Sequence, residues 1–289
     1  MRLGNSRASR NVEDRRGMRM RGGRAGRGGG LGLVGLLVVL GVGWFTGIDI
    51  TPLLTGGGGG SNIPVQTGGT PAVLSPEEQR AGDFAARVLG TTETVWGAVF
   101  PEQAGGPYRA PVMVLYSGVT QSPCGNASGA TGPFYCPIDR KAYLDTAFFA
   151  TMARELGAGG DFAAAYVIAH EVAHHVQNEL GILGKAQQIQ SQSSKADANA
   201  ISVRIELQAD CLAGVWGAHV DHLLDPGDLE EALNAAQKIG DDYLMRQAGR
   251  VPNPHSFTHG TSAQRQRWFA TGYDSGQMAA CDTFSAGKL

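Results

Sequence analysis

The segment HEVAHH at 170–175 carries residue types whose spacing suits a metal site. On a helix, His170 and His174 lie four residues apart on one face, so their imidazoles converge. Neutral imidazole is a natural zinc ligand, and two imidazoles from adjacent turns form half of a site. Glu171 follows the first histidine, so its carboxylate can reach an attacking water without binding the metal. The spacing therefore predicts a zinc hydrolase site with Glu171 as general base.

The residues around these histidines help to interpret the motif, because HExxH also occurs in unrelated proteins. All of the flanking positions considered are uncharged: Val167, Ile168, Ala169, Val172, Ala173 and Val176. A surface helix with two chance histidines would carry lysine and glutamate there, whereas a helix buried around a dry metal site would not. We therefore favour metal ligands over solvent-facing or hydrogen-bonded core histidines. His175 projects about 100° away from His174, and we expect it to form a structural hydrogen bond.

A second predicted helix, SVRIELQADCLAGVWGAH at 202–219, can supply the missing ligand. A catalytic zinc needs a third protein ligand and leaves its fourth position for water. Glu206 and Asp210 lie four residues apart on this helix: Glu206 can complete the ligand set, and Asp210 can accept the free N–H of a ligand histidine. The alternative is that both carboxylates are solvated surface charges. Their apolar neighbours argue against it, because a carboxylate on such a helix needs a partner.

The segment SFTHGTSAQRQRW at 256–268 holds two further candidates for chemistry. His259 and Arg265 could donate hydrogen bonds or charge to the oxyanion that forms when a carbonyl is attacked. The spacing leaves a second interpretation open, in which Arg265 pairs with a structural carboxylate and His259 only packs. His255 is a weaker candidate than His259.

The four cysteines are even in number and all follow the apolar run described below. Cys124 and Cys136 bracket a glycine-rich loop, and a disulfide there would contribute about 3 kcal/mol in the chain-entropy model. The other pair, Cys211 and Cys281, would tie the second predicted helix to the C terminus. The spacing does not fit a structural zinc site made of closely paired cysteines. Two disulfides would indicate an oxidising compartment, and reduced, inert thiols are the alternative.

Charge and glycine content single out the N-terminal region. Residues 1–30 hold nine arginines and two acidic residues, a local charge of +7 that leaves −9 for the rest of the chain. The run 28–48 has no charged residue, and at about 1.5 Å per residue its helix would be long enough to cross a bilayer. We expect one transmembrane helix there, preceded by a disordered, Arg/Gly-rich cytoplasmic tail at 1–27. The positive-inside rule then places the rest of the chain outside the cytoplasm, as a domain anchored in the cell membrane.

Three other interpretations of this region fit the sequence less well. The apolar stretch could be the core of a signal peptide, but no convincing small-x-small cleavage site follows it. It could be a buried glycine-rich core helix, which fits poorly beside the arginine-rich run. The basic arm could bind nucleic acid, but that leaves the apolar run unexplained, so we expect no nucleic-acid partner.

The remaining chain is expected to form a flexible linker at 49–74 and one catalytic domain at 75–289. Ser75, Pro76 and Glu78 have the pattern of a capping box that starts a helix reaching about 99. Strands are predicted at 110–118 and 134–145, the second near an edge because of Pro137. Helical patterns follow at about 146–157, 161–180, 186–222 with a break, and 226–248. The expected fold is α+β, mainly helical, with a small sheet beside the active-site helix.

Several longer strings resemble the neutral zinc metallopeptidase family of bacteria, a gluzincin-type group, and together they extend over nearly the whole chain. They are NVEDRRG at 11–17, GPFYCPIDRKAYLD at 132–145, HEVAHHVQ at 170–177, ELQADCLAGVW at 206–216, FTHGTSAQRQRWF at 257–269 and CDTF at 281–284. As a set these strings are far more specific than HExxH alone.

The resemblance implies a zincin fold with a defined set of site residues. Their implied roles are His170, His174 and Glu206 as zinc ligands, Glu171 as base, and Asp210 as support. It also favours His259 and Arg265 near the oxyanion, because related membrane-associated gluzincins carry a similar His…Arg pair. An extended peptide would then lie along the strand at 134–145.

We therefore expect a membrane-anchored zinc metallopeptidase with Zn²⁺ as cofactor and a peptide or protein as substrate. Two alternatives remain: a zinc hydrolase of a non-peptide amide or ester, and a zinc-binding scaffold without catalysis. The intact Glu171 argues against the scaffold. Proteolysis within the membrane is not expected, because the metal motif lies far along the chain from the apolar run at 28–48. The sequence gives no indication of oligomeric state.

Overall fold

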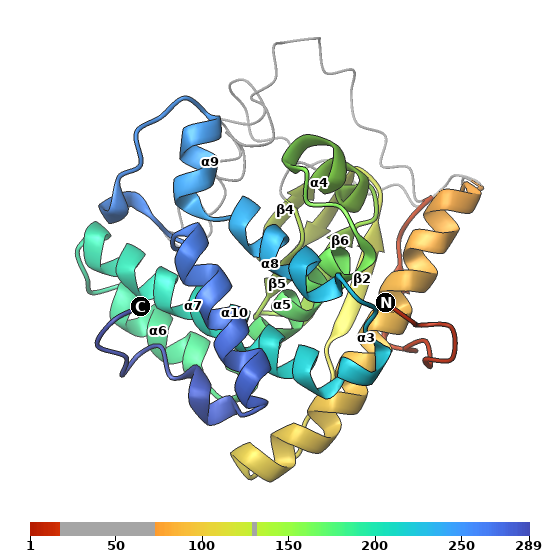
Figure 1. The fold of residues 1–289 in the computed structure, drawn as a ribbon, viewed down its shortest axis with the longest axis horizontal. Coiled ribbons are helices and arrows are strands. Elements are labelled where there is room, and N and C mark those ends of the chain that lie inside the picture. The colour runs from red at the N-terminus through yellow and green to blue at the C-terminus, as the bar shows by residue number, and fades with distance from the viewer. Residues whose placement is uncertain (18–72, 129–131) are drawn as a thin grey trace.

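The computed structural model describes residues 1–17, 73–128 and 132–289. The transmembrane helix predicted at 28–48 and nearly all of the linker predicted at 49–74 lie outside these residues. Among the described residues, none of the helices combines the length and the apolar character needed to cross a bilayer. The described residues form an α+β fold in which helices predominate and pack beside one small sheet, as the sequence predicted (Figure 1).

Four of the described strands form one sheet in the order β1-β2-β6-β5. They are β1 (Val12–Asp14), β2 (Val112–Tyr116), β6 (Lys141–Asp145) and β5 (Phe134–Cys136). Both β1 and β6 run parallel to β2, whereas β5 runs antiparallel to β6 at one end of the sheet. Strands β3 (Val119–Ser122) and β4 (Gly125–Ser128) form a separate antiparallel hairpin.

The prediction of a single strand at 134–145 is wrong, because the structure has the two strands β5 and β6 there. The chain turns between them at 137–140, where Pro137 cannot donate a backbone hydrogen bond and Arg140 has a φ of 61°. The expectation that this segment lies at an edge is confirmed for β5 alone.

Helix α3 (Pro76–Ala104) begins at the predicted capping box. The hydroxyl of Ser75 accepts the N–H of Glu78 (3.2 Å), and the Glu78 carboxylate accepts the N–H of Ser75 (2.8 Å). The helix runs past its predicted end near 99 and stops at Gly105, whose left-handed backbone has a φ of 77°.

The other helices are α4 (Phe148–Leu156), α5 (Asp161–Glu179), α6 (Ile182–Gln190), α7 (Lys195–His219), α8 (Asp228–Lys238), α9 (Asp241–Gln247) and α10 (Ser262–Ser275). The break expected within 186–222 separates α6 from α7. The segment predicted as one helix at 226–248 is two helices, with Gly240 between them, and α10 follows the last of the predicted helical patterns.

Helices α7 and α10 pack unusually closely because each has a glycine at the contact. A Cβ added at Gly272 would collide with the carbonyl oxygen of Cys211, and one added at Gly214 would collide with that of Phe269. This approach lets a side chain from α10 reach the interior face of α7. The two disulfides join Cys124 to Cys136 and Cys211 to Cys281, which confirms the expected pairs.

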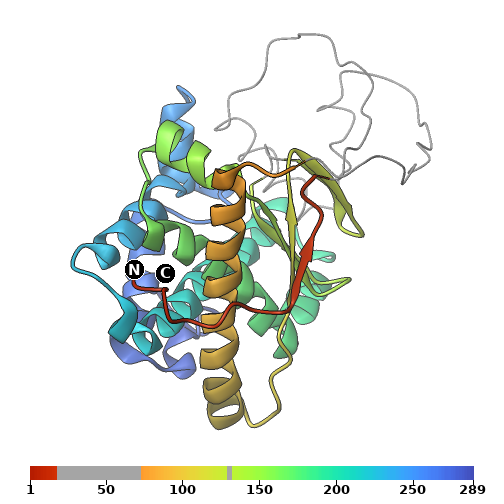
Figure 2. The same cartoon turned by 90° about the vertical axis from the view of Figure 1, so that its right-hand side faces the viewer.

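Residues 1–17 are an ordered part of the domain, which differs from the disordered tail expected at 1–27. In Figure 2 this segment crosses α3 and then joins the sheet as β1. Leu3 is buried in the main core, and the N–H of Ser9 donates to the carbonyl of Ala86 on α3 (2.8 Å). The arginine-rich composition concealed this order, because the contacts involve residues far away in the sequence.

Glu93 on α3 is the main side-chain anchor of this segment. Its carboxylate accepts hydrogen bonds from Arg7 Nη2 (2.7 Å), Ser9 Oγ (2.5 Å) and Asn11 Nδ2 (2.8 Å). The Glu93 side chain is only 10% exposed, so few water molecules could replace these contacts.

We expect Glu93→Ala to lower the free energy of unfolding by about 1.5–3 kcal/mol, because three donors lose a charged acceptor. Urea unfolding of the full chain measures this loss. The control is Glu102→Ala on the same helix, an exposed position where the change should stay within about 0.5 kcal/mol. Equal effects of the two substitutions would contradict the anchoring role of Glu93.

Candidate metal centre

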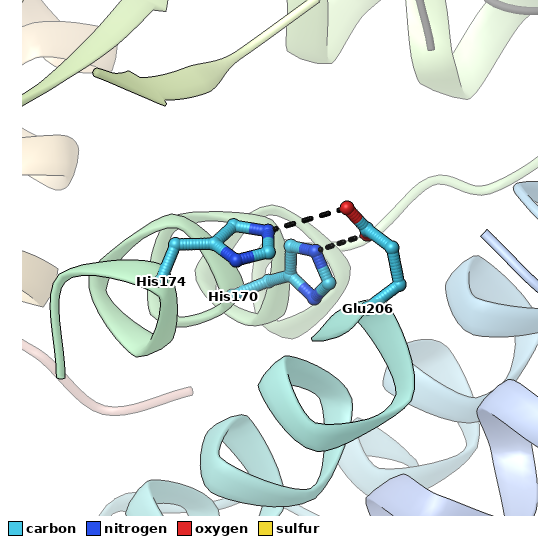
Figure 3. Close-up of side chains that lie close together, drawn as sticks. All are labelled: His170, His174 and Glu206. Atoms are coloured by element: carbon cyan, nitrogen blue, oxygen red, sulfur yellow. Dashed lines mark hydrogen bonds and ion pairs between the residues drawn. The ribbon is translucent and has the colours of Figure 1, made fainter. Parts of the chain in front are cut away.

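Three side chains that the sequence singled out converge between α5 and α7 (Figure 3). Nε2 of His170 lies 3.1 Å from one carboxylate oxygen of Glu206, and Nε2 of His174 lies 3.5 Å from the other. One ligand atom from each residue lies within 4.8 Å of the others, and all three side chains are buried. The arrangement is a possible site for a metal ion.

The proton on His170 is fixed by a buried partner. Nδ1 of His170 lies 2.9 Å from Oδ1 of Asp210, which is fully buried. A carboxylate can only accept, so Nδ1 carries the proton and Nε2 is directed to Glu206. Asp210 thus lies where the sequence placed it, one turn from the third ligand and hydrogen-bonded to the first.

His174 has a different partner, Gln177, which sequence reasoning missed. Nδ1 of His174 lies 2.8 Å from Oε1 of Gln177, while the Gln177 amide donates to the carbonyl of Ile205 (2.8 Å) and to Oε1 of Gln208 (3.0 Å). Because that amide nitrogen is used for donation, Oε1 must accept the proton of His174. Gln177 could have been found from the sequence, because it lies three residues after His174 on the same face of the helix.

These side chains fit zinc by their donor chemistry. With Nδ1 bonded to Asp210 in one ring and to Gln177 in the other, Nε2 is the atom of each histidine that faces the carboxylate oxygens of Glu206 and that can bind a metal once it is deprotonated. Acceptors placed against each other repel unless a proton or a cation lies between them. Imidazole nitrogen and carboxylate oxygen are both zinc ligands, and a set of three protein ligands is typical of catalytic zinc.

Burial and charge act differently on the three side chains of the candidate metal site. Burial opposes the charged form of His170, but Asp210 and Glu206 outweigh it and raise its pKa to about 10. Burial dominates at His174 and lowers its pKa to about 4, since its Nδ1 partner is a neutral amide. Burial also opposes the charged form of Glu206, yet the neighbouring histidines hold its pKa well below its usual range.

Glu171 lies beside these ligands with 9% of its surface exposed. Burial, reinforced by the charge of Glu206, raises its pKa to about 7. A carboxylate with a pKa near 7 can both accept and return a proton at neutral pH, as a general base must.

The guanidinium of Arg265 is bonded to the carboxylate of Asp210. Its Nε and Nη2 donate to the two Asp210 oxygens, each at 2.8 Å, and its side chain is 2% exposed. The hydroxyl of Tyr166 donates to the same carboxylate (2.6 Å). The structure therefore favours the interpretation in which Arg265 pairs with a structural carboxylate. Tyr166 was missed, although it lies four residues before His170 on the same helix face.

His259 is held by Asp241, a residue that the sequence did not single out. One oxygen of Asp241 accepts the backbone N–H groups of Thr258 (2.8 Å), His259 (2.7 Å) and Gly260 (3.0 Å), and the other lies 3.3 Å from Nδ1 of His259. His259 interacts electrostatically with Glu206 and with Glu171. Nδ1 of His259 also lies 3.1 Å from the hydroxyl of Thr258, so Nδ1 is the ring atom that meets both side-chain partners.

His175 forms structural hydrogen bonds, as its position in the motif predicted. Its Nε2 donates to the carbonyl of Arg109 (2.6 Å), so its Nδ1 accepts from the hydroxyl of Tyr135 (3.0 Å). Asn178 donates to that hydroxyl as well (3.1 Å). Burial lowers the pKa of His175 to about 4, which keeps the ring neutral. The third histidine of the motif thus fastens edge strand β5 to α5.

A second acidic group of Asp161, Asp228 and Glu231 also has metal-like spacing. Its carboxylates already have other partners. The amino group of Met1 lies 2.9 Å from Asp161 and 3.1 Å from Asp228, and Glu231 accepts the N–H of Phe162 (3.0 Å) at the start of α5. We assign no metal to this group, whose contact with α5 helps to hold the histidine helix in place.

The family model described as "Putative neutral zinc metallopeptidase" matches residues 1–284. The chain is similar to "Uncharacterized protein YpfJ" of Escherichia coli, with 49% identity over 98% of this chain and 99% of that protein. It is also similar to "Uncharacterized protein Mb2605" of Mycobacterium bovis, with 43% identity over 70% of this chain and 71% of that protein. No solved structure gives a significant match. The names of these relatives assign no activity.

We expect Gln177→Met to weaken zinc binding by about 10- to 100-fold, because the proton on Nδ1 of His174 loses its acceptor. Competition with a chromophoric chelator measures the zinc dissociation constant. The matched control is Gln187→Met at an exposed position of α6, which should bind zinc like the wild type. Unchanged affinity in the Gln177 variant would show that this amide does not support the ligand.

Proposed function

The chain belongs to the "Putative neutral zinc metallopeptidase" family, and we propose that it is a zinc-dependent endopeptidase of the gluzincin type. The observation that carries this proposal is the buried convergence of His170, His174 and Glu206 with Glu171 beside them. Family membership supports a hydrolase that uses zinc. The finer type rests on the order of the motif, two histidines from one helix and a glutamate from a later one.

The proposed chemistry divides between the metal and the residues around it. When bound, zinc would polarise a carbonyl oxygen and lower the pKa of a water ligand to about 7. Glu171 accepts a proton from the attacking water and returns it to the leaving amine nitrogen. The pKa of about 7 that burial gives this carboxyl supports both steps.

His259 is the candidate for stabilising the oxyanion, in place of the pair expected from the sequence. Arg265 has its donors engaged by Asp210, whereas His259 bonds to Asp241 through Nδ1 and interacts electrostatically with Glu206 and Glu171. Asp241 supports His259 by fixing the proton on Nδ1, so that Nε2 can act as a donor when the ring is charged. Burial opposes that charge, but Glu206 and Asp241 outweigh it and raise the pKa of His259.

Strand β5 favours a peptide over a compact amide or ester as the substrate. It lies at one end of the sheet. The hydroxyl of Tyr135 on β5 is hydrogen-bonded to His175 on α5, which is the residue after His174. An extended chain can add to such an edge through main-chain hydrogen bonds, which would bring its carbonyl groups past the ligands. The strand therefore supports peptidase activity over the other hydrolase class.

We expect Glu171→Gln to bind one zinc per chain and to lose at least about 10²-fold in turnover, since the proton acceptor is gone. Metal analysis and cleavage of a peptide library by the full chain measure the two properties. Glu155→Gln, an exposed position on α4, should match the wild type in both. Full activity of Glu171→Gln would refute the mechanism, and a zinc-loaded wild type that cleaves no peptide would support the scaffold alternative.

We expect Asp241 to act through His259, which a double-mutant cycle can test. His259→Ala should lower kcat by about 10²-fold through loss of an oxyanion donor, and Asp241→Asn should lower it about tenfold. In the double variant, kcat should be little lower than in His259→Ala alone, because the histidine through which Asp241 acts is absent. Effects that simply multiply, with zinc content unchanged, would show that Asp241 has no action through this histidine.

A further inference from the structure

The surface that receives residues 1–17 extends over several elements of the domain. The N–H of Arg2 donates to the carbonyl of Leu223 (2.7 Å), near the C-terminal end of α7. The N–H of Met113 on β2 donates to the carbonyl of Asn11 (2.8 Å), and β1 then pairs with β2 along its length. After β1, the N–H of Arg15 donates to the carbonyl of Leu115 (2.7 Å). The segment is therefore held from end to end by backbone hydrogen bonds.

Helix α3 has glycines where the segment lies against it. A Cβ at Gly90 would collide with the carbonyl oxygen of Arg7, and one at Gly82 would collide with the guanidinium of Arg16. Glycine inside a helix costs about 1 kcal/mol relative to alanine. Its presence at position 90 has a structural reason, because the backbone of Arg7 leaves no room for a Cβ there. The two positions are eight residues apart and lie on the face of α3 that the segment crosses.

Four of the five arginines in this segment, Arg2, Arg7, Arg15 and Arg16, are bonded to the domain or to their neighbours in β1. Arg7 pairs with Glu93 (2.7 Å), and Arg2 pairs with Asp225 (3.3 Å). Arg16 pairs with Asp14 (2.7 Å) and also donates to the carbonyl of Glu78 on α3. Arginines bonded in this way are part of a fold, which weakens the argument that they mark a cytoplasmic tail.

Strand β1 completes one end of the sheet. Lys141 on β6 pairs with Glu13 (2.6 Å), so β1 is linked to a second strand beyond its neighbour β2. Without β1, the edge of β2 would lose its backbone partners, which is unfavourable for a buried strand. A strand can pair in this way only if it lies on the same side of a membrane as its sheet.

We propose that residues 1–17 fold with residues 73–128 and 132–289 as one unit in one compartment. The uncharged run of 21 residues at 28–48 is long enough for one crossing and too short for two. One crossing would put β1 and β2 on opposite sides of the bilayer. The two disulfides favour an oxidising compartment for both parts. This topology replaces the cytoplasmic N terminus expected from the sequence and does not depend on the proposed enzymatic activity.

Cysteine labelling of the full chain in intact bacteria tests the topology. Asn5→Cys and Val251→Cys each place one thiol on the surface, the first in the N-terminal segment and the second at a position that is 89% exposed. A membrane-impermeant maleimide is applied before and after permeabilisation. Both variants should behave alike, labelled either before permeabilisation or only after it. Labelling of one variant in intact cells and of the other only after permeabilisation would overturn the proposal.

A second experiment tests whether the segment stays bound to the domain. A cleavage site for a specific protease is inserted at the glycine run 56–60 of the full chain. After cleavage, the N-terminal fragment should elute with the rest of the protein in gel filtration and separate from it in urea. Separation without denaturant would contradict the proposed unit. Adding Glu93→Ala should weaken the association, whereas the exposed control Glu102→Ala should not.

Discussion

Asp210 has no exposed surface and lies among three helices, where a charged carboxylate is stable only if donors surround it. Tyr166 and His170 on α5 and Arg265 on α10 provide those donors to the Asp210 side chain of α7. The need to satisfy one buried charge therefore fixes how the three helices meet. It also explains the close packing of α7 and α10, because the guanidinium must reach the interior of the domain.

The two histidines of the candidate metal site are supported by unlike partners. His170 donates to an anion, which makes its Nε2 a stronger donor to a metal, whereas His174 donates to the neutral amide of Gln177. From Gln177 the hydrogen bonds continue through Gln208 to the carbonyl of Cys281, whose disulfide partner follows Asp210 in the chain. Both supports thus lead back to the same part of α7. A zinc ion would be largely balanced in charge by Glu206 and Glu171, because Asp210 is already paired with Arg265.

The convergence of His170 and His174 could be predicted from the sequence because two residues four apart on one helix must share a face. Gln177 and Tyr166 could have been found by the same rule. Asp241 could not, since its contact with His259 joins α9 to a distant loop, and spacing alone cannot distinguish a substrate-facing arginine from one bound to a buried carboxylate. The order of residues 1–17 was hidden for a similar reason: an arginine-rich composition suggests disorder, and only the distant partners Glu93 and Met113 reveal a strand. The cytoplasmic N terminus was predicted from composition alone, without knowledge of these contacts.

Anomalous diffraction at the zinc absorption edge, from crystals of the zinc-loaded full chain, tests the metal centre most directly. The account predicts one strong peak bonded to Nε2 of His170, Nε2 of His174 and a carboxylate oxygen of Glu206. Asp210 should stay hydrogen-bonded to His170 and outside the first coordination sphere. A peak at Asp161, Asp228 and Glu231, or a loaded protein with no peak between α5 and α7, would contradict it.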